Sequence, residues 1–385
     1  MILKWIEKKA FAKGLTNTQF FRDYVRRFAY RRAGGDPERV HEMALEKLQE
    51  YEDVIQERFH DFLSPELDIL KIEINGRRFL PFGTAAGLDK NADAVEPLSY
   101  IFGFQEVGTI IVNPREGNKR PRVAVDERNG DLFNAQGFPS KGLRHARYNI
   151  FNYRKYRGGN GAILGSICGI PPGPEELDVA FEETELLLTE LDSLVDGFVW
   201  NPFSPNTAAL TALRTPETFE KYAKLVKQTA GNRWALVKMG PYDNKPEKRE
   251  QWLDLVSAWI RGGGDGIVAV NTYMVPKDKV PSKDWGYPSA GRSGRFLQPY
   301  RQQAILSVRR KFPDAVIIAA GGIDSPYQAW SAFEAGADAL EGYTPYTFHG
   351  FGLLREIVYD IRKKLYLSGR TFQEWRKEIK ERQTV

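Results

Sequence analysis

The chain has 385 residues, of which 42% are hydrophobic and 27% charged. This composition is ordinary for a folded globular protein and too apolar for a disordered one. A single cysteine, Cys168, excludes an intramolecular disulfide framework and a cysteine-based metal cluster. The four histidines lack metal-ligand spacing, so no metal site is expected. No apolar run reaches the roughly 18 residues of a membrane-spanning helix, and the N-terminus lacks the apolar core of a secretory signal.

The net charge of +5 is unevenly distributed along the chain. Residues 1–35 contain nine basic and two acidic residues, a net +7, so residues 36–385 carry a net −2. A nucleic-acid-binding domain needs a basic face on its folded body, so nucleic acid is not an expected partner. The length fits either more than one average domain or one closed α/β barrel with an extension.

The first part of the chain is predicted to be helical. Apolar side chains recur at helical spacing, with arginines between them, at Phe20, Phe21, Tyr24, Val25 and Phe28. Asp36-Pro37 predicts the start of a further helix, as an N-cap followed by proline at the first helical position. The apolar face of this helix is predicted to comprise Val40, Met43, Ala44, Leu48, Tyr51, Val54 and Ile55. Basic amphipathic helices lie at anionic membrane surfaces, but the pattern alone favours a helical cap packed on the main domain.

From about residue 80, short apolar runs that end in polar residues or glycine alternate with helical stretches. Eight such runs predict parallel strands joined by crossover helices; they begin at residues 81, 104, 161, 197, 234, 266, 315 and 338. Eight units in roughly 270 residues predict a (β/α)8 barrel, a fold in which the chemistry is located at the carboxyl ends of the strands. The candidates at these ends are Lys90, Thr109, Asn201, Ser204, Asn206, Lys238, Asn271, Thr272, Gly321, Gly322, Tyr343 and Thr344.

Several of these residues suggest a bound phosphate and an electron-rich ring. Gly321 and Gly322 let backbone N–H groups approach a phosphate, and the loops after strands 7 and 8 are the usual phosphate site of such barrels. A Gly-Gly pair alone is also compatible with a simple tight turn. Lys90 and Lys238 end predicted strands, where a lysine is costly to bury unless it meets an anion or a group such as a reduced flavin. The alternative is a surface lysine at a loop edge. No G-x-G-x-x-G follows a strand, so a Rossmann site is not supported.

The densest polar cluster is NPFSPNT, which starts at Asn201. Its carboxamides, Asn201 and Asn206, suit the amide and imide edges of a planar heterocycle. Ser204 could accept a proton if its hydroxyl is coupled to water or another base. The alternative is a turn that caps the following helix, for which Ser204-Pro205 is suited. No His–Asp pair accompanies Ser204, so a hydrolase triad is not expected.

Taken together, these segments resemble the dihydroorotate dehydrogenase family, and in particular its membrane-associated, quinone-reducing class. The resemblance covers most of the chain from about Asp36 and is carried by GTAAGLDKNADAV, VGTIIVNPREGNKRPRV, NAQGFPSKG, NPFSPNTAAL, ALVKMGP, AVNTY, GRSGR, IIAAGGIDS and YTPYTFHG. The segment DPERVHEMALEKL resembles the helical extension with which this class reaches membrane quinone. The resemblance therefore favours an interfacial role for the N-terminal helices.

The resemblance implies FMN as cofactor, dihydroorotate or a related cyclic compound as substrate, quinone as oxidant and a role in pyrimidine biosynthesis. It implies that Ser204 is the base that takes a proton from C5 of dihydroorotate while a hydride leaves C6 for the flavin. The implied substrate contacts are Lys90, Asn201, Asn206, Asn271 and Thr272. The implied FMN contacts are Ala86, Gly87, Lys90, Thr109, Asn201, Lys238, Thr272, Gly294, Gly321, Gly322, Tyr343 and Thr344.

The expected organisation is a basic helical extension at residues 1–65, an FMN-binding barrel at 66–368 and a basic tail at 369–385. The extension is expected to contact quinone and an anionic membrane surface. The resemblance thus implies a cytoplasmic protein bound peripherally to the inner face of the cell membrane.

Two positions depart from the family pattern. Pro139 stands where the family has the asparagine of Gly-Phe-Asn, and Ile167 stands where it has the asparagine of Val-Asn-Leu-Gly. Loss of hydrogen-bonding groups from a polar site costs about 1–3 kcal/mol per unpaired buried group. Gln136 or Ser140 could compensate. Otherwise the pocket accepts a less polar cyclic substrate, and a third possibility is a non-catalytic flavoprotein that has kept the fold.

Overall fold

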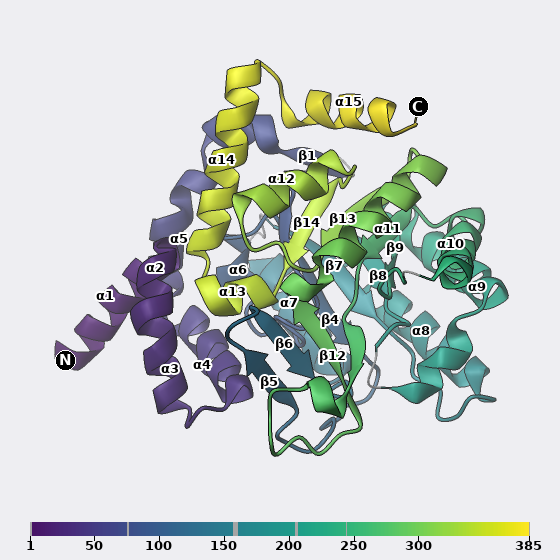
Figure 1. Cartoon of the computed structure of the whole chain (residues 1–385), viewed down its shortest axis with the longest axis horizontal. Helices are drawn as coiled ribbons and strands as arrows, with labels where there is room; N and C mark the ends of the chain where they lie inside the picture. The colour runs from purple at the N-terminus through teal and green to yellow at the C-terminus, as the bar shows by residue number, and fades with distance from the viewer. Residues whose placement is uncertain (1, 75–76, 157–160, 205–206, 244, 385) are drawn as a thin grey trace.

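The computed structural model describes residues 2–74, 77–156, 161–204, 207–243 and 245–384. Eight parallel strands close into a barrel near the centre of the molecule (Figure 1). Their order around the barrel is β10-β13-β14-β3-β4-β7-β8-β9. The strands are β3 (Phe82–Thr84), β4 (Phe104–Ile110), β7 (Ala162–Ile167), β8 (Gly197–Trp200), β9 (Trp234–Met239), β10 (Gly266–Ala269), β13 (Val316–Ala320) and β14 (Ala339–Gly342). Each coincides with one of the eight predicted runs, so the predicted (β/α)8 barrel is confirmed.

The barrel strands form because their residues are apolar on both faces, one packed inside the barrel and the other against helices. All residues of β7, β8, β10 and β14 are buried. The surrounding helices are α6 (Val95–Ser99), α7 (Leu143–Tyr156), α8 (Leu177–Leu191), α9 (Pro216–Ala230), α10 (Pro246–Arg261), α11 (Gln298–Lys311), α12 (Pro326–Glu334) and α14 (Gly352–Ser368). Thr215 and Ser325 cap α9 and α12 by accepting a backbone N–H, and a proline follows each cap.

A second sheet lies beside the barrel and was not predicted. Its order is β11-β12-β6-β5, all antiparallel. The strands are β5 (Val123–Asp126), β6 (Asp131–Asn134), β11 (Tyr273–Pro276) and β12 (Ser289–Gly294). Phe133, Trp285 and Ala290 form the centre of its own small apolar cluster. A separate hairpin pairs β1 (Ile72–Ile74) with β2 (Arg77–Phe79).

The N-terminal segment is helical, as predicted. It comprises α1 (Ile2–Thr16), α2 (Thr18–Phe20), the π-helical turn η1 (Phe21–Arg26), α3 (Arg27–Arg32), α4 (Pro37–Glu50) and α5 (Glu52–Phe59). The predicted start of α4 is confirmed, because Asp36 accepts the N–H of Glu38 at 2.9 Å. Leu48, Tyr51, Val54 and Ile55 are buried as expected. Ala44 is exposed, so its assignment to the apolar face was wrong.

Shorter elements connect and complete the fold. They are the 3-10 helices η2 (His60–Leu63), η3 (Pro65–Leu70), η4 (Ala208–Leu213), η5 (Lys277–Lys279) and η6 (Arg295–Leu297), and the helices α13 (Thr344–His349) and α15 (Phe372–Thr384). The N-terminal helices lie along α13 and α14 in Figure 1. Arg26 fixes them there: its guanidinium binds both carboxylate oxygens of Glu127 at 2.9 and 2.7 Å and the carbonyl of Thr347 at 2.8 Å. Arg26 is buried, so part of the basic leader serves to anchor the helices.

Candidate active site

One cavity opens at the carboxyl ends of the barrel strands. It contains about 1220 Å³ of space, part of it open to solvent. Every predicted site residue that the structure describes lines it: Ala86, Gly87, Lys90, Thr109, Asn201, Ser204, Lys238, Asn271, Thr272, Gly294, Gly321, Gly322, Tyr343 and Thr344. The remaining predicted residue, Asn206, lies outside the described residues. Residues taken from seven barrel strands and their loops therefore face one space.

One wall of the cavity is formed by glycine residues, which expose their backbone to the cavity. Gly321 and Gly322 have φ values of +104° and +68°, and a Cβ on Gly322 would lie 2.5 Å from Cγ of Gln298. A side chain therefore does not fit there. The buried Arg301 donates to the carbonyl of Gly321 at 2.8 Å and holds the loop. The hydroxyls of Ser293 and Thr344 lie 2.8 Å apart beside it. Exposed backbone and hydroxyl groups of this kind suit a phosphate.

The polar side chains of the cavity form a connected row. The amide of Asn271 donates to Oδ1 of Asn201 at 3.0 Å, and the amide of Asn201 donates to Oγ1 of Thr109 at 2.8 Å. Oδ1 of Asn271 accepts the backbone N–H of Thr272 at 2.7 Å. The Oγ1 of Thr272 is buried without a hydrogen-bond partner among the described residues. The row thus has fixed orientations and hydrogen-bonding capacity left for a ligand.

Ser204 follows β8 in a loop that Arg214 holds. The Arg214 guanidinium donates to the carbonyl of Pro202 at 3.0 Å and to that of Ser204 at 3.4 Å, and it lies 4.7 Å from the centre of the Phe203 ring. Phe203 in turn packs on Gly240, where a Cβ would approach it to 2.6 Å. The sequence interpretation missed Arg214, because nothing local links it to a loop ten residues earlier.

A charged triad of Glu106, Lys238 and Glu341 lies at the base of the cavity. Nζ of Lys238 donates to Oε2 of Glu106 at 2.6 Å and to Oε1 of Glu341 at 2.9 Å, and both glutamate side chains are fully buried. Burial opposes the charge on Lys238, but the two glutamates outweigh it and raise its pKa. The sequence interpretation missed both glutamates. The available signal was an acidic residue inside each of two predicted strands, FQEVGTI and ALEG.

Lys90 lines the cavity, and α4 packs against a second lining residue, Tyr343. Burial lowers the pKa of Lys90 to about 8, although Glu38 opposes this shift. His41 of α4 contacts Tyr343 edge-on, with ring centres 5.4 Å apart. Burial, followed by the charge of Lys90, lowers the pKa of His41 to about 3, so this histidine is neutral at physiological pH. The N-terminal helices therefore reach the rim of the cavity.

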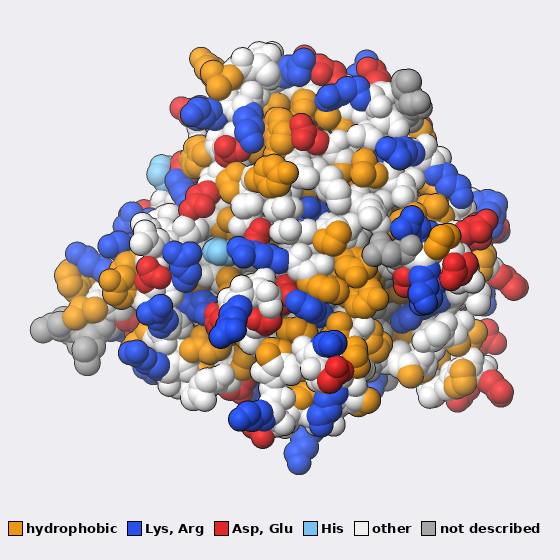
Figure 2. All heavy atoms as spheres, viewed as in Figure 1, with side chains coloured by type: hydrophobic (Ala, Val, Ile, Leu, Met, Phe, Trp, Pro, Cys, Tyr) orange, Lys and Arg blue, Asp and Glu red, His pale blue; other side chains and the backbone are white. Residues whose placement is uncertain are grey.

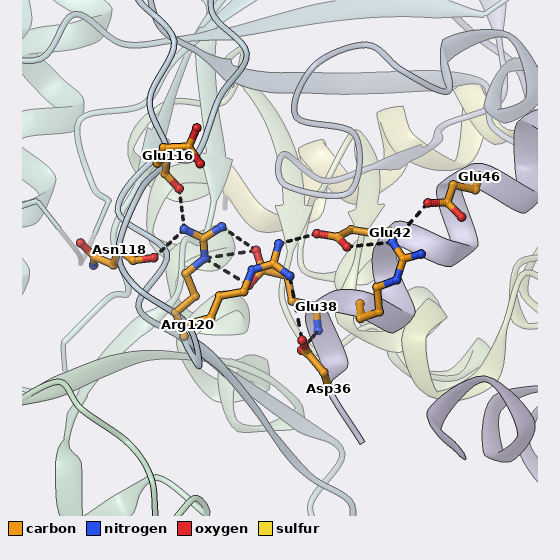
Figure 3. A network of polar contacts seen from close by, with 9 residues as sticks. Asp36, Glu38, Glu42, Glu46, Glu116, Asn118 and Arg120 are labelled. Atoms are coloured by element: carbon orange, nitrogen blue, oxygen red, sulfur yellow. Dashed lines mark hydrogen bonds and ion pairs between the residues drawn. The ribbon is translucent and has the colours of Figure 1, made fainter. Parts of the chain in front are cut away.

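A salt-bridge network fixes α4 against the segment that leads into β5 (Figure 3). The Glu38 carboxylate accepts from Nη2 and Nε of Arg122 at 2.7 and 3.1 Å, and both side chains are buried. Nη1 of Arg122 donates to the carbonyls of Glu116 and Asn118 at 2.6 and 2.7 Å. Arg120 adds ion pairs to Glu38 and Glu42 of α4. Because the central pair is desolvated and fully bonded, the extension is held in one position on the barrel.

The two departures from the family pattern are not equivalent. Pro139 lines the cavity, but Ile167 is fully buried and does not belong to the described lining. The interpretation that both positions make the pocket less polar is therefore wrong for Ile167 and stays a hypothesis for Pro139. Gln136 lines the cavity and can compensate. Ser140 does not belong to the described lining, and its hydroxyl accepts the N–H of Gly142 at 3.0 Å.

The barrel and the cavity at its mouth define a barrel enzyme that binds small ligands at the carboxyl ends of its strands. Residues 69–365 match the family described as dihydroorotate dehydrogenase. The chain therefore belongs to the dihydroorotate dehydrogenase family, and the predicted family and oxidoreductase class are confirmed.

Relatives over most of the chain support this membership. A protein of Pseudoalteromonas atlantica named dihydroorotate dehydrogenase (quinone) is 29% identical over 78% of this chain and 90% of its own length. A protein of the same name from Corynebacterium striatum is 31% identical over 75% of this chain and 78% of its own. The crystal structure of dihydroorotate dehydrogenase from Eimeria tenella in complex with ferulenol has the same fold. Its TM-score is 0.71 at 24% identity, and the match covers 88% of this chain and 94% of that one.

Proposed function

We propose that this protein oxidises (S)-dihydroorotate to orotate, with FMN as cofactor, Ser204 as base and a quinone as the final electron acceptor. The observation that carries the proposal is the convergence of the predicted residues on one cavity, together with family membership. The reaction serves pyrimidine biosynthesis. When bound, FMN supplies a two-electron acceptor for the hydride.

The cavity fits FMN at both ends. Gly294, Gly321 and Gly322 leave backbone where a phosphate needs close approach, with the Thr344 hydroxyl alongside. Lys238 lines the same cavity as the amide row and supplies an ammonium for the electron-rich edge of the ring. Ala86, Gly87, Thr109, Asn201, Thr272 and Tyr343 complete the proposed FMN contacts.

The proposed chemistry assigns each polar residue one task. Lys90 binds the carboxylate of dihydroorotate, and Asn201 and Asn271 orient the amide edges of its ring, with Asn206 and Thr272 as further contacts. The Ser204 hydroxyl passes its own proton to water and accepts the proton from C5 as the hydride leaves C6, which forms the C5–C6 double bond. The Arg214 contacts keep the Ser204 loop in place for this transfer.

A second candidate keeps the FMN barrel and changes the substrate to a less polar cyclic compound. Pro139 favours it, because proline offers neither a side-chain donor nor an N–H at the cavity wall. Gln136 favours the first candidate, because its carboxamide belongs to the same wall.

Steady-state kinetics with dihydroorotate and a soluble quinone analogue decide between the two. We expect the flavin-loaded wild-type protein to form orotate and Pro139→Asn to change kcat/KM by less than about tenfold, because the Gln136 carboxamide already serves this wall. No orotate from flavin-loaded wild-type protein, together with turnover by Pro139→Asn, would instead favour the second candidate. Ile167→Asn is the less informative reversion, because it buries a carboxamide away from the cavity.

We also propose that the N-terminal helices lie against an anionic membrane surface, at the inner face of the cell membrane, where quinone is available. Trp5, Ile6, Tyr24 and Phe28 expose 51–65% of their surface. Figure 2 shows hydrophobic side chains among lysines and arginines over this end of the molecule. None of the described helices is long and apolar enough to cross a bilayer. The division into residues 1–65, 66–368 and 369–385 belongs to this proposal.

A further inference from the structure

The charged triad contains one more carboxyl group than its single ammonium can balance. Glu106 comes from β4, Lys238 from β9 and Glu341 from β14, three strands that are not neighbours in the barrel. Lys238 and Glu341 line the cavity, so both face a ligand bound there. With both glutamates ionised, the triad carries a net −1 in a place where their side chains have no solvent contact.

An unbalanced buried charge is costly, and a buried acid normally takes up a proton to avoid it. Each carboxyl group keeps one oxygen, Oε1 of Glu106 and Oε2 of Glu341, buried without a hydrogen-bond partner among the described residues, so the site does not solvate two carboxylates fully. The ionised form is better stabilised at Glu106 than at Glu341, because Glu106 also accepts the N–H of Ala86 at 3.4 Å. Burial, and then the charge of Glu106, raises the pKa of Glu341 well above its ordinary value. Glu341 is therefore the member that holds the proton.

We propose that Glu341 is a positioning residue that balances charge in the flavin site by keeping a proton when the bound flavin is reduced. The inference rests on the proposed FMN site. The charge of Lys238 is already matched by Glu106, so an ionised Glu341 repels the negative charge of a reduced ring and a protonated Glu341 does not. Glu341 thus holds its proton to higher pH beside a reduced ring. Glu341 then has one pKa beside the oxidised flavin and a higher one beside the reduced flavin. In the pH window between these two values, reduction of the flavin by two electrons is accompanied by uptake of one proton from solvent onto Glu341.

The surroundings of Glu341 contain no competing charge among the described residues. Its partners on the neighbouring strands are Ala320 of β13 and Gly83 of β3, which do not ionise. Tyr346 of α13 packs beside the end of β14, and burial raises its pKa, so it stays neutral. The charged groups that face Glu341 are therefore Glu106 and Lys238 alone within the described part of the chain.

The test measures the reduction potential of bound FMN against pH in four proteins: wild type, Glu341→Gln, Glu106→Gln and the matched surface control Glu334→Gln. In wild type, the equilibrium constant for reduction should fall an extra tenfold per pH unit across the window, which is about 30 mV for a two-electron couple. The extra slope should vanish in both triad variants, because the single remaining carboxyl beside Lys238 stays ionised. The control should follow wild type.

A second readout detects the proton itself. The infrared difference spectrum between oxidised and reduced wild-type protein, recorded inside the window, should contain the C=O stretch of a newly protonated carboxyl group, absent from Glu341→Gln. If the reduction potential of bound FMN changes with pH in the same way in wild type and in Glu341→Gln, the inference is overturned and the proposed function stays intact. If the protein binds no FMN, both are overturned. If Glu341→Gln does not fold, Glu106→Gln and the wild-type infrared band decide by the same criteria.

Discussion

Lys90 is the residue whose charge changes closest to physiological pH at the substrate end of the cavity. Burial lowers its pKa to about 8, and it lines the cavity that is proposed to take the substrate carboxylate. As pH rises through 8, free Lys90 loses its proton and with it the attraction for the carboxylate. We therefore expect KM for dihydroorotate to rise above pH 8, approaching tenfold per pH unit, while kcat changes less because the bound carboxylate holds the proton on Lys90.

Steady-state kinetics from pH 6 to about 10 check this prediction about the charge state of the lysine. Lys90→Met should raise KM at neutral pH and remove the rise above pH 8. Lys141→Met is a matched control, because Lys141 is exposed and pairs with Asp93 at 3.0 Å outside the described cavity lining. A wild-type KM that stays constant between pH 7 and 9 would contradict the assignment of Lys90 to the carboxylate.

At the scale of elements, a buried carboxylate helps to hold α15 against the barrel. Asp338, just before β14, accepts from Nη2 of Arg309 at 2.8 Å and from the N–H of Ile317 at 2.8 Å. Arg376 and Lys380 of α15 bind its other oxygen. Trp375 adds an apolar contact, stacked on a tryptophan of α12 at 4.2 Å. Burial opposes ionisation, but Arg376 and the other cations outweigh it and lower the pKa of Asp338.

Asp338→Asn should destabilise the protein by about 3–5 kcal/mol, because it leaves buried cations without their partner. Urea unfolding followed by circular dichroism measures this loss, and the exposed Asp314→Asn is the control. The pH dependence has a defined sign. The pKa of Asp338 in the folded state is below its unfolded value of about 3.9. The contribution of Asp338 to the free energy of unfolding is therefore complete above about pH 3.9 and is lost as pH falls through the folded-state pKa. A loss below about 1 kcal/mol would show that Asp338 does not anchor α15.

The elements differ in how far the sequence predicts them. The eight barrel strands are recognisable because each is a short apolar run buried on both faces. The β11-β12-β6-β5 sheet is not, because the burial of β5 and β11 is mixed and β6 pairs with β12 from about 160 residues further along the chain. Large sequence separation also explains why part of the site was not predicted. Lys238 stands out at a strand end, whereas Glu106 and Glu341 gain meaning only when the barrel brings them to it across 132 and 103 residues.

At the scale of the whole molecule, the basic leader divides into an anchoring part and an outward part. Lys4 and Lys8 pair with Glu50 and Asp53, and Arg26 is buried against Glu127. Exposed cations near the exposed aromatic residues include Lys9, Lys13, Arg27, Arg31 and Arg32. Deletion of residues 1–35 would remove the anchoring part as well, together with the buried Ala12 and Leu15. Charge reversal of the outward part is therefore the sharper test of membrane binding.

Lys13→Glu, Arg27→Glu and Arg31→Glu combined should weaken binding to vesicles that contain phosphatidylserine. Each basic residue near an anionic surface contributes about 1 kcal/mol, so loss of three lowers the partition coefficient by at least about 100-fold. Wild-type binding should also fall steeply as ionic strength rises, because screening shortens the range of the attraction. The control reverses Lys283, Arg310 and Lys311, exposed residues of the barrel domain. Vesicle sedimentation measures all three proteins, and equal loss in both triple variants would mean that net charge, and not the N-terminal helices, governs binding.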